Sequence, residues 1–397
     1  MSRIDILRPD QLTRVDEMQW AKFLDQRPDL RGPYFDIRYV RAIAAAVPHA
    51  GVARIFDNER VVAYFPYQIR SGVLQPMGAP LSDYHGLISA SDATIDFDEL
   101  LKATGAKRLE FQGWVGPQSP RANGVALKRR IADTSAGFDA WWQMQDALHH
   151  KFFKNISRCR RNVEKDFGGF AFTWERVTPD LADWVLSRKR EQYRKTGMHD
   201  VFGCGWTRTV LDHLAIGTDD GFGLYAGVFR HEGRVVAAEI CLAGPNEVHL
   251  WFPAYDPSYY RYTIGILLAV AIIEYGAKAG IKRFDFGTGG EDYKAPLTID
   301  GGTCHDGELD LKVPRVSVVL DRLAKSLPAA RTRIEAMRLS LRRRVKLIRA
   351  TEIDPKGWRR AFLALAHRAF VRGGSDMRPL GMMARAGLLF LPFLRHD

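Results

Sequence analysis

The sequence predicts an α+β fold in which two similar units, each a mixed central sheet flanked by helices, precede a basic helical extension. Two β-hairpins are each followed, at nearly the same distance, by a short strand of similar sequence, which indicates a duplicated unit. The charge distribution changes sharply near residue 315. Because 397 residues exceed the usual size of a single core, we expect units at 1–135 and 136–314 and a tail at 315–397.

The two hairpins define the repeat, because each has a strand, a short polar turn and a second strand that begins Arg-Val-Val-Ala. They are Gly51–Asp57 with a partner from Arg60, and Gly223–Arg230 with a partner from Arg234. Downstream, KRLEF at 107–111 resembles KRFDF at 282–286. The first begins 47 positions after Arg60, and the second begins 48 positions after Arg234. Nearly equal spacing of two matched landmarks favours duplication over chance.

The second unit contains a strand–helix–strand crossover. Glu247–Phe252 alternates polar and apolar residues and is expected to end at Pro253. Ile264–Ala279, with Thr263 as its N-cap, is apolar on nearly every face and is therefore predicted to be a buried helix. The strand Lys282–Phe286 follows, so the two strands should be parallel and lead into a polar, glycine-rich loop.

The other expected helices differ in character. The first unit has only the short helix Phe97–Thr104 for its crossover. Asp139–Lys165 combines an apolar face with a basic face and is predicted to form one or two amphipathic helices. Asp180–Thr196 and Trp206–Ile216 should precede the second hairpin, and the tail should contain helices at 316–327, 329–350 and 355–371.

Composition limits the function classes. From Arg315 onward there are 19 Lys and Arg against six Asp and Glu, whereas the remainder has 39 against 40, so the net charge of +12 belongs to the tail. The four scattered cysteines form no CxxC pair, which argues against a zinc site or a disulfide framework and favours a reducing compartment. We see no secretory signal, and the longest clean apolar run, Ile264–Ile273, is too short to span a bilayer.

The order of hairpin, strand, crossover helix, strand and loop resembles the GNAT acyltransferase superfamily. The similarity is closer to the branch with tandem GNAT units, which contains the Fem peptidoglycan aminoacyltransferases, the CelD-like acyltransferases encoded with cellulose and exopolysaccharide genes and, more narrowly, N-acyltransferases that modify the bacterial holdfast. It covers about Pro33 to Pro296, and its motifs are Tyr255-Asp256-Pro257, Gly265, Gly280, Phe284-Asp285-Phe286-Gly287 and Glu291-Asp292-Tyr293-Lys294.

The resemblance implies an acyl donor, acyl-CoA such as acetyl-CoA, at the start of the helix after Thr263. Free N–H groups at a helix N-terminus are suited to phosphate. The candidate segment is Arg261-Tyr262-Thr263-Ile264-Gly265. This segment has one glycine, whereas ordinary GNAT proteins have the turn Arg/Gln-x-x-Gly-x-Gly/Ala. The Fem branch uses aminoacyl-tRNA, so aminoacyl-tRNA remains an alternative donor. The simpler alternative is that Thr263 only caps a core helix.

Acyl transfer needs a base for the acceptor proton and a donor to the oxyanion. Glu239 lies in an otherwise apolar strand, where desolvation would raise its pKa toward neutrality, so it is the first candidate base. An edge-strand glutamate facing water is the alternative. Asp292 and Glu291, on the loop, are other candidate bases; Tyr293 is a candidate oxyanion donor, and Lys294 a candidate ligand for a substrate phosphate or carboxylate.

Two further groups are candidates for acceptor binding. Asp83-Tyr84-His85 follows a Pro-Gly-rich bend in the first unit, where two units would share a groove. Arg158 and Arg161 lie three residues apart on one helix face and suit an anionic acceptor such as a sugar nucleotide or a lipid-linked pyrophosphate. The alternative for Asp83-Tyr84-His85 is a purely structural turn, and the alternative for Arg158 and Arg161 is a solvated basic face. No G-x-S-x-G, Walker or H-E-x-x-H motif is present.

The tail has three possible ligands. Its basic helices and the apolar Leu380–Leu394 favour peripheral attachment to an anionic membrane surface. Arg338 and Arg342 have a spacing suited to the phosphates of a nucleotide, and the resemblance to the holdfast-modifying enzymes implies cyclic di-GMP. Transfer RNA is the third possibility. We expect no DNA partner.

The residues and the resemblance together imply two functions. The first is a cytoplasmic acyltransferase, at the inner face of the membrane if the tail attaches there, that modifies an amino or hydroxyl group of an exopolysaccharide, holdfast or cell-envelope precursor. The second is a catalytically inactive GNAT-like regulatory module that binds a nucleotide such as cyclic di-GMP or an anionic lipid.

Overall fold

The computed structural model describes residues 3–116, 120, 125–218, 220–245, 247–289, 293–311 and 344–372. The chain divides into two compact units, Met1–Ser326 and Leu327–Asp397. The first of these units holds every strand described and all of the candidate catalytic residues that fall in the described ranges.

The N-terminal half of the first unit contains the first predicted hairpin. Its helices are α1 (Arg14–Gln26), α2 (Ile37–Ala46) and α3 (Phe97–Thr104), with short 3₁₀ turns η1 (Pro9–Gln11), η2 (Pro28–Leu30) and η3 (Pro33–Phe35). Its strands are β1 (Ile4–Leu7), β2 (Ala50–Asp57), β3 (Arg60–Arg70), β4 (Val73–Pro76), β5 (Ile88–Ser89) and β6 (Arg108–Trp114). The predicted helix Phe97–Thr104 and the predicted first hairpin are confirmed.

The second half repeats this order with longer elements. Its helices are α4 (Phe138–Phe167), α5 (Pro179–Thr196), α6 (Trp206–Ile216) and α7 (Ile264–Lys278), with η4 (Pro257–Tyr262) and η5 (Ala295–Leu297). Its strands are β7 (Val125–Asp133), β8 (Ala171–Arg176), β9 (Gly223–His231), β10 (Arg234–Ala243), β11 (Val248–Tyr255), β12 (Arg283–Thr288) and β13 (Ile299–Asp310). The second hairpin, the buried crossover helix and the parallel pairing of the strands on either side of it are confirmed.

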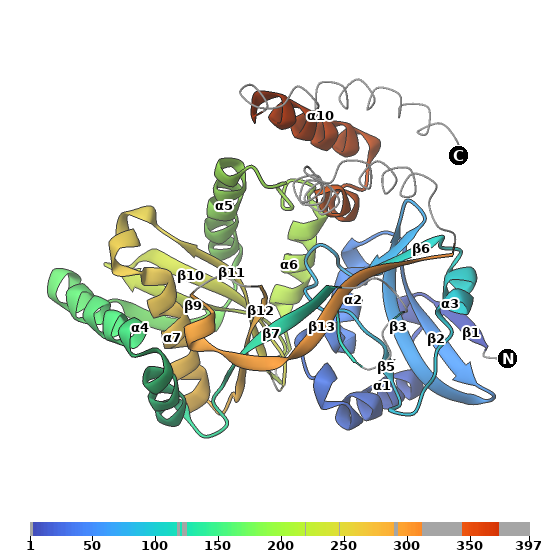
Figure 1. The fold of residues 1–397 in the computed structure, drawn as a ribbon, viewed down its shortest axis with the longest axis horizontal. Helices are drawn as coiled ribbons and strands as arrows, with labels where there is room; N and C mark the ends of the chain where they lie inside the picture. Colours follow the sequence, from blue (N-terminus) through green and yellow to red (C-terminus); the bar gives the residue numbers. More distant parts are fainter. Residues whose placement is uncertain are drawn as a thin grey trace, which may run out of the picture. The chain divides into compact units, whose positions relative to one another are not determined.

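All the strands join one 13-stranded sheet that runs through both halves (Figure 1). Its order is β1-β2-β3-β4-β6-β13-β7-β12-β11-β10-β9-β8, with β5 beside β3. The halves exchange strands at its centre: β7 follows β6 in the chain but pairs with β12, and β13 follows β12 but pairs with β6. Backbone hydrogen bonds therefore hold the two repeats together, which no local sequence pattern predicted.

Helices α4 and α7 cover one face of the second half (Figure 1). The apolar residues of α7 pack against alternate residues of β9, β10 and β11, and the buried residues of α4 close over them. Helix α4 shows the predicted amphipathic pattern, and a non-helical residue, His149, divides it into two segments. Helix α5 contacts β11 and α6 contacts β9, while Phe202, between these helices, packs on Phe252 of β11.

Two local predictions are corrected. Strand β11 was expected to end before Pro253, but it continues through this proline to Tyr255, with Pro253 opposite Glu239. A β-bulge precedes Pro253 and β12 no longer pairs with β11 there, so a residue without an N–H group is tolerated. Thr263 does precede α7, but it has φ of 54° and its side chain makes no capping hydrogen bond.

The second unit is described only over 344–372. Residues 344–351 are helical, and α10 (Pro355–Arg372) confirms the predicted helix at 355–371. Trp358 and Phe362 stack on this helix with their ring centroids 5.4 Å apart. In the described part of the chain, no helix is both long and apolar enough to cross a membrane.

Candidate functional site

The candidate site lies where two parallel strands separate. Strands β11 and β12 pair at only two positions, Val248 with Phe284 and His249 with Asp285. A bulge at Trp251 then shifts the register of β11 against β10, and β11 runs on toward the first turn of α7. The place where parallel strands stop pairing, beside a helix N-terminus, is a common ligand position in α/β proteins.

His249 stands at the point where the strands separate. Its neighbours Val248 and Leu250 pack under α7, so its own side chain points to the opposite face of the sheet. There its Nε2 lies 3.1 Å from Oδ2 of Asp83, and its Nδ1 lies 3.6 Å from Oδ1 of Asp285. Burial opposes the charged imidazolium, but these two carboxylates outweigh burial and raise the pKa of His249 to about 9.

Asp285 anchors the charges around His249. Its carboxylate accepts hydrogen bonds from the Tyr84 hydroxyl at 2.9 Å, from Arg129 at 3.0 Å and from the Gly287 N–H at 2.5 Å. Burial alone would raise the pKa of Asp285, but His249, Arg129 and the Gly287 N–H together hold it well below its usual range. Asp285 therefore stays ionised and holds His249 in place.

A second carboxylate shares the same arginine. Arg129 on β7 donates to Glu247 at 3.2 Å, and Arg283 donates to the other oxygen of Glu247 at 3.1 Å. These groups come from β7, β12 and the start of β11, and the side chains of Arg129, Glu247 and Asp285 are almost fully buried. Charges at such depth are stable only when they are paired, so this cluster fixes the junction of the two halves.

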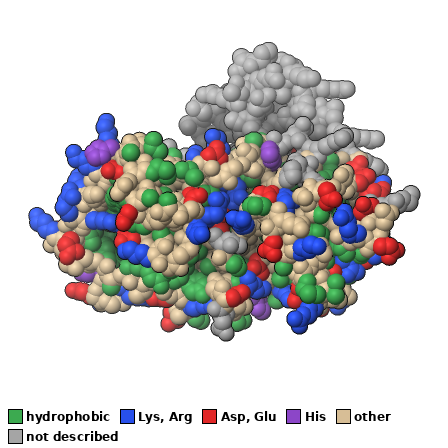
Figure 2. Space-filling model, turned by 90° about the horizontal axis from the view of Figure 1, so that it is seen from below, with side chains coloured by type: hydrophobic (Ala, Val, Ile, Leu, Met, Phe, Trp, Pro, Cys, Tyr) green, Lys and Arg blue, Asp and Glu red, His purple; other side chains and the backbone are tan. Residues whose placement is uncertain are grey.

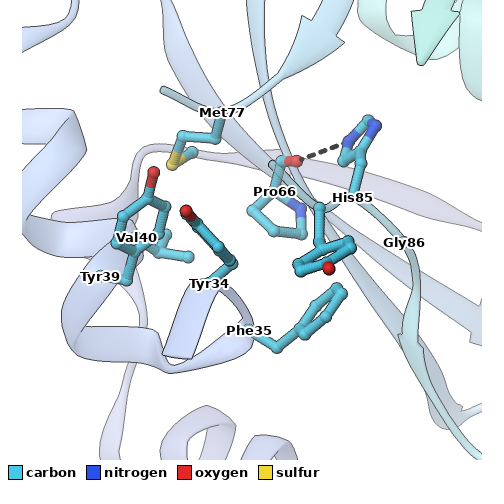
Figure 3. Close-up of a pocket in the computed structure, with 9 residues that line it drawn as sticks. Tyr34, Phe35, Tyr39, Val40, Pro66, Met77, His85 and Gly86 are labelled. Atoms are coloured by element: carbon cyan, nitrogen blue, oxygen red, sulfur yellow. Dashed lines mark hydrogen bonds between the residues drawn. The ribbon is translucent and has the colours of Figure 1, made fainter. Parts of the chain in front are cut away.

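Aromatic rings line the first-half side of the junction. The Tyr34 ring lies 5.1 Å from the His249 ring and 5.8 Å from the Tyr84 ring, in edge-to-face contacts. Behind them is a cavity of about 10 Å³, whose lining includes Tyr34, Tyr39, Met77 and His85 (Figure 3). That is room for one water molecule, so this cavity is too small to hold an acceptor.

The predicted triplet Asp83-Tyr84-His85 divides between two environments. Asp83, with 34% of its side chain exposed, and Tyr84 reach His249 and Asp285 of the second half. His85 instead lies in the first-half core, where its Nε2 is 3.3 Å from the Pro66 carbonyl and burial lowers its pKa to about 3 (Figure 3). A neutral, enclosed His85 thus serves packing in this structure.

Glu239 is a buried residue of an interior strand, which excludes the edge-strand alternative. Glu239 is paired with Gly227 of β9, and a Cβ atom added to Gly227 would point at Ile272 of α7. Directly paired residues of antiparallel strands face the same side, so Glu239 is on the α7 face of the sheet. Burial raises the pKa of Glu239 to about 7, against the opposing effect of Lys189, Lys294 and His249. A carboxyl group with this pKa exchanges protons near neutral pH, as a general base must.

The loop after β12 is described in part. Tyr293 and Lys294 are half-buried just before η5, and the Lys294 charge acts on Glu239. The Lys294 Nζ lies 5.9 Å from the Tyr293 ring centroid. Glu291 and Asp292, the other candidate bases, and Arg338 and Arg342 of the tail lie outside the described residues.

The predicted donor segment forms the last turn of η4 and the first turn of α7. Ile266 and Leu267 donate to the Thr263 carbonyl, so helix geometry leaves the N–H groups of Ile264 and Gly265 without an acceptor inside the helix. A Cβ atom added at Gly265 would contact the Tyr255 ring at 3.6 Å without a clash, and Gly265 and Thr263 are partly exposed, so this turn is not sealed in the core. These features suit a phosphate group.

The residues before Thr263 are already engaged. Tyr262, although buried, donates its hydroxyl to Asp166 of α4 at 2.6 Å, and Arg261 lies 3.4 Å from the same carboxylate. The side chain of Arg261 remains 73% exposed. An incoming phosphate would compete with Asp166 for Arg261, and the Asp166 charge would oppose its approach.

Arg158 and Arg161 lie on the exposed face of α4, opposite its buried residues. Arg158 donates to Asn155 one turn away at 2.7 Å. Arg161 lines a groove on α4 together with residues from both sides of the bend at His149. The structure places both arginines away from the His249 cluster, on the face of the sheet that α4 and α7 cover.

Sequence reasoning missed His249, Arg129 and Glu247. Only His249 carried a signal, since a polar residue between Val248 and Leu250 in a strand must face the side opposite those two. Arg129 and Glu247 lie more than 100 positions apart and become partners only through the exchange of β7 and β13.

Comparison with known families supports this geometry. Residues 150–295 match the family described as "Acetyltransferase (GNAT) domain". This similarity lies in the second half of the chain, and the matched residues include α5–α7, β8–β12 and the positions of Glu239, His249 and Lys294. No curated protein matches the sequence.

Three solved structures are similar to this chain to different degrees. FemX covers 78% of this chain and 98% of its own at 9% identity, with a TM-score of 0.51, which shows a common fold. A tandem GNAT protein from the clavulanic acid biosynthesis pathway covers 79% and 100% at 12% identity, with a TM-score of 0.46. The C-terminal domain of a putative lysylphosphatidylglycerol synthetase from Agrobacterium fabrum covers 78% and 97% at 13% identity, with a TM-score of 0.47. The fold is thus mixed α and β, with tandem GNAT-like units and a basic C-terminal extension.

Proposed function

We propose that the chain is an acyltransferase that moves an acyl group from acyl-CoA to an amino or hydroxyl group of an exopolysaccharide, holdfast or cell-envelope precursor. The observation that carries the proposal is the separation of β11 and β12 after His249, beside the free N–H groups of Ile264 and Gly265. Titratable side chains with shifted pKa values lie on both faces of the sheet at this level.

The donor is assigned to the first turn of α7. The N–H groups of Ile264 and Gly265 and the exposed guanidinium of Arg261 are the groups that would hold its pyrophosphate. Acyl-CoA supplies an activated thioester carbonyl, which an amine or hydroxyl attacks. The absence of the second glycine from the usual turn leaves aminoacyl-tRNA as the other donor to test.

Glu239 is the proposed base. With a pKa of about 7, it can take the proton from the acceptor nitrogen or oxygen as that atom attacks the thioester carbonyl near neutral pH. Lys294 lowers the pKa of Glu239 and so favours its ionised form, and Tyr293 is the proposed donor to the oxyanion.

The acceptor is assigned to the level where β11 and β12 stop pairing, which Asp83 approaches from the other face of the sheet. The partly exposed carboxylate of Asp83 attracts an ammonium or a sugar hydroxyl, and His249 and Tyr84 fix the geometry behind it. Proton removal by Asp83, with His249 as its partner, is the alternative to Glu239. Glu239 and Asp83 lie on opposite faces of the sheet, so substituting each residue singly shows which of the two acts as the base.

Thiol release from acyl-CoA tests the proposal. The full chain should release thiol in the presence of amino-sugar precursors, and Glu239→Gln and Lys294→Ala should lower that rate while the fold stays intact. Release that depends on acceptor but is unchanged in both variants removes Glu239 and Lys294 from the mechanism. No thiol release from acyl-CoA and no deacylation of aminoacyl-tRNA, across sugar nucleotides and lipid-linked sugars, supports the second function, an inactive module that binds a nucleotide such as cyclic di-GMP or an anionic lipid.

The location follows from the tail as a second part of the proposal. Its excess of basic residues favours a cytoplasmic protein bound peripherally to the anionic inner membrane surface. Sedimentation with anionic liposomes should fall strongly when the chain ends at Val313. Unchanged sedimentation of the shortened chain would exclude the tail as the membrane anchor.

A further inference from the structure

The bend in α4 creates a groove that the proposed reaction does not use. Helix α4 is interrupted at His149, which has φ of −134° and ψ of 43°, although no proline or glycine lies nearby. Aromatic packing across the interruption holds the bend instead, since the ring of Phe153 lies 4.7 Å from that of Trp142 and 6.1 Å from that of Trp141.

The groove has a volume of about 280 Å³. Its lining comes from both segments of α4 and consists of Trp142, Asp146, His150, Phe153, Lys154, Ser157 and Arg161. Trp142 and Phe153 form an aromatic wall, and the polar groups lie at spacings of three or four residues, as one helix face requires. Its size is close to that of a small-ligand site.

The charges in the groove are arranged for an anion. Among the residues that the structure describes, Lys154 and Arg161 pair with no carboxylate, whereas neighbouring Arg160 reaches Glu274 at 3.6 Å. The Nδ1 of His150 lies 3.1 Å from Asp146, which orients the imidazole within the groove. Lys154 and Arg161 are seven positions apart, about 10 Å along the helix axis, which suits a diphosphate with its attached group.

Basic side chains gather at this end of the molecule. Figure 2 shows Lys and Arg side chains along the left edge, at the end of the sheet where Figure 1 places α4. The apolar Leu148 is 68% exposed and Met144 is 42% exposed on the same helix. The groove is thus a cationic recess with aromatic and apolar surface around it.

We propose that this groove binds the diphosphate of a nucleotide-type substrate, with Lys154 and Arg161 on the phosphate oxygens, Ser157 as a hydrogen-bond donor and Trp142 against the attached group. The inference rests on the proposed function only for the source of the diphosphate, which is either the nucleotide end of the donor or the pyrophosphate of a sugar-linked acceptor. Cys159, which is buried on the side of α4 away from Ser157 and Arg161, lies 3.7 Å from Thr263, so α4 carries the groove on one side and contacts the donor turn with the other.

Binding of inorganic pyrophosphate to the full chain, measured by isothermal titration calorimetry, tests the groove. We expect Lys154→Glu and Arg161→Glu each to weaken binding at least tenfold, because each change replaces an attractive charge in the groove with a repulsive one. Lys151→Glu is the matched control, because Lys151 is an exposed cation of the same helix that does not line the groove, and it should change affinity by less than threefold. Equal losses in all three variants, or no pyrophosphate binding by the unaltered chain, would overturn the proposal.

Competition identifies the source of the diphosphate. Displacement of pyrophosphate by coenzyme A assigns the groove to the donor, and displacement by a uridine diphosphate sugar assigns it to the acceptor. If neither competes, the groove binds an adventitious ion only and the proposal fails. Glu239→Gln should leave pyrophosphate affinity unchanged, so a failure of the catalytic assignment is distinguishable from a failure of the groove.

Discussion

His249 on β11 and Asp83 in the loop after β4 lie 3.1 Å apart, and their contact joins the second repeat to the first. His249 is buried, while Asp83 is partly open to solvent at the level where β11 and β12 separate. The pair therefore contributes to the stability of the junction between the repeats and also borders the candidate acceptor position. It also makes the protonation state of His249 a measurable property of the folded protein.

The charge on His249 should make stability fall as pH rises. Its pKa is about 9 in the folded chain and about 6.5 when unfolded, so the folded state binds more protons between these values. The stabilisation is complete below about pH 6.5 and is lost through pH 9, with a limit on the order of 3 kcal/mol. Urea unfolding from pH 6 to 9.5 measures it, and His249→Gln should flatten that slope. A wild-type slope as flat as that of the variant would contradict a charged His249.

The contact between Asp83 and His249 should appear as a coupling energy. Because Asp83 is one-third exposed, we expect only about 1 kcal/mol between Asp83→Asn and His249→Gln in a double-mutant cycle. Chemical unfolding of the two single variants and the double variant measures it. Strict additivity of the two changes would show that the halves are held together without this pair.

Removal of Arg129 should be far more damaging. Arg129→Ala leaves the buried carboxylates of Asp285 and Glu247 without their shared partner, which typically costs about 3–5 kcal/mol. Arg60→Ala is the matched control, because the Arg60–Asp92 pair is more than 60% exposed on both sides and contributes about 0–1 kcal/mol. Thermal or urea unfolding compares them. Similar small losses in both variants would show that the Arg129 cluster does not hold the junction.

Activity should rise with pH if Glu239 is the base. A carboxyl group with a pKa of about 7 must lose its proton before it can accept one, so kcat/KM should increase through pH 7 and level off above it. Glu239→Gln should remove this limb and lower kcat by roughly 10²–10⁴-fold. Asp83→Asn is the comparison on the opposite face. Loss of the limb in Asp83→Asn, with Glu239→Gln unaffected, would move the base to Asp83.

Local patterns allowed much of the fold to be predicted. The hairpins, the apolar helix α7 and the amphipathic helix α4 depend on residues close in the chain, and their periodicity was visible in the sequence. Glu239 was recognised by the same reasoning, as a charge in an apolar strand, and it is buried in β10 as the argument required. The desolvation that raises its pKa follows directly from that position.

Long-range pairings were beyond this reasoning. The exchange of β7 and β13 depends on strands that are distant in the chain, and the cluster of Arg129 and Glu247 exists only because of it. Pro253 was misjudged because a proline normally ends an interior strand, whereas β11 has a bulge and an unpaired side at that point. The bend at His149 has no sequence signal, because side-chain packing rather than proline produces it.

The central claim, that an acyl donor is held at the first turn of α7, can be tested by titrating acyl-CoA into the full chain. Gly265→Leu adds a side chain beside the N–H groups of Ile264 and Gly265, and the space near Tyr255 accommodates its first atom. Lys278→Leu, at the other end of α7, is the control. The account predicts that unaltered protein and Lys278→Leu bind acyl-CoA alike and that Gly265→Leu binds at least tenfold more weakly. Equal affinity in Gly265→Leu, or no binding by the unaltered chain, would contradict it.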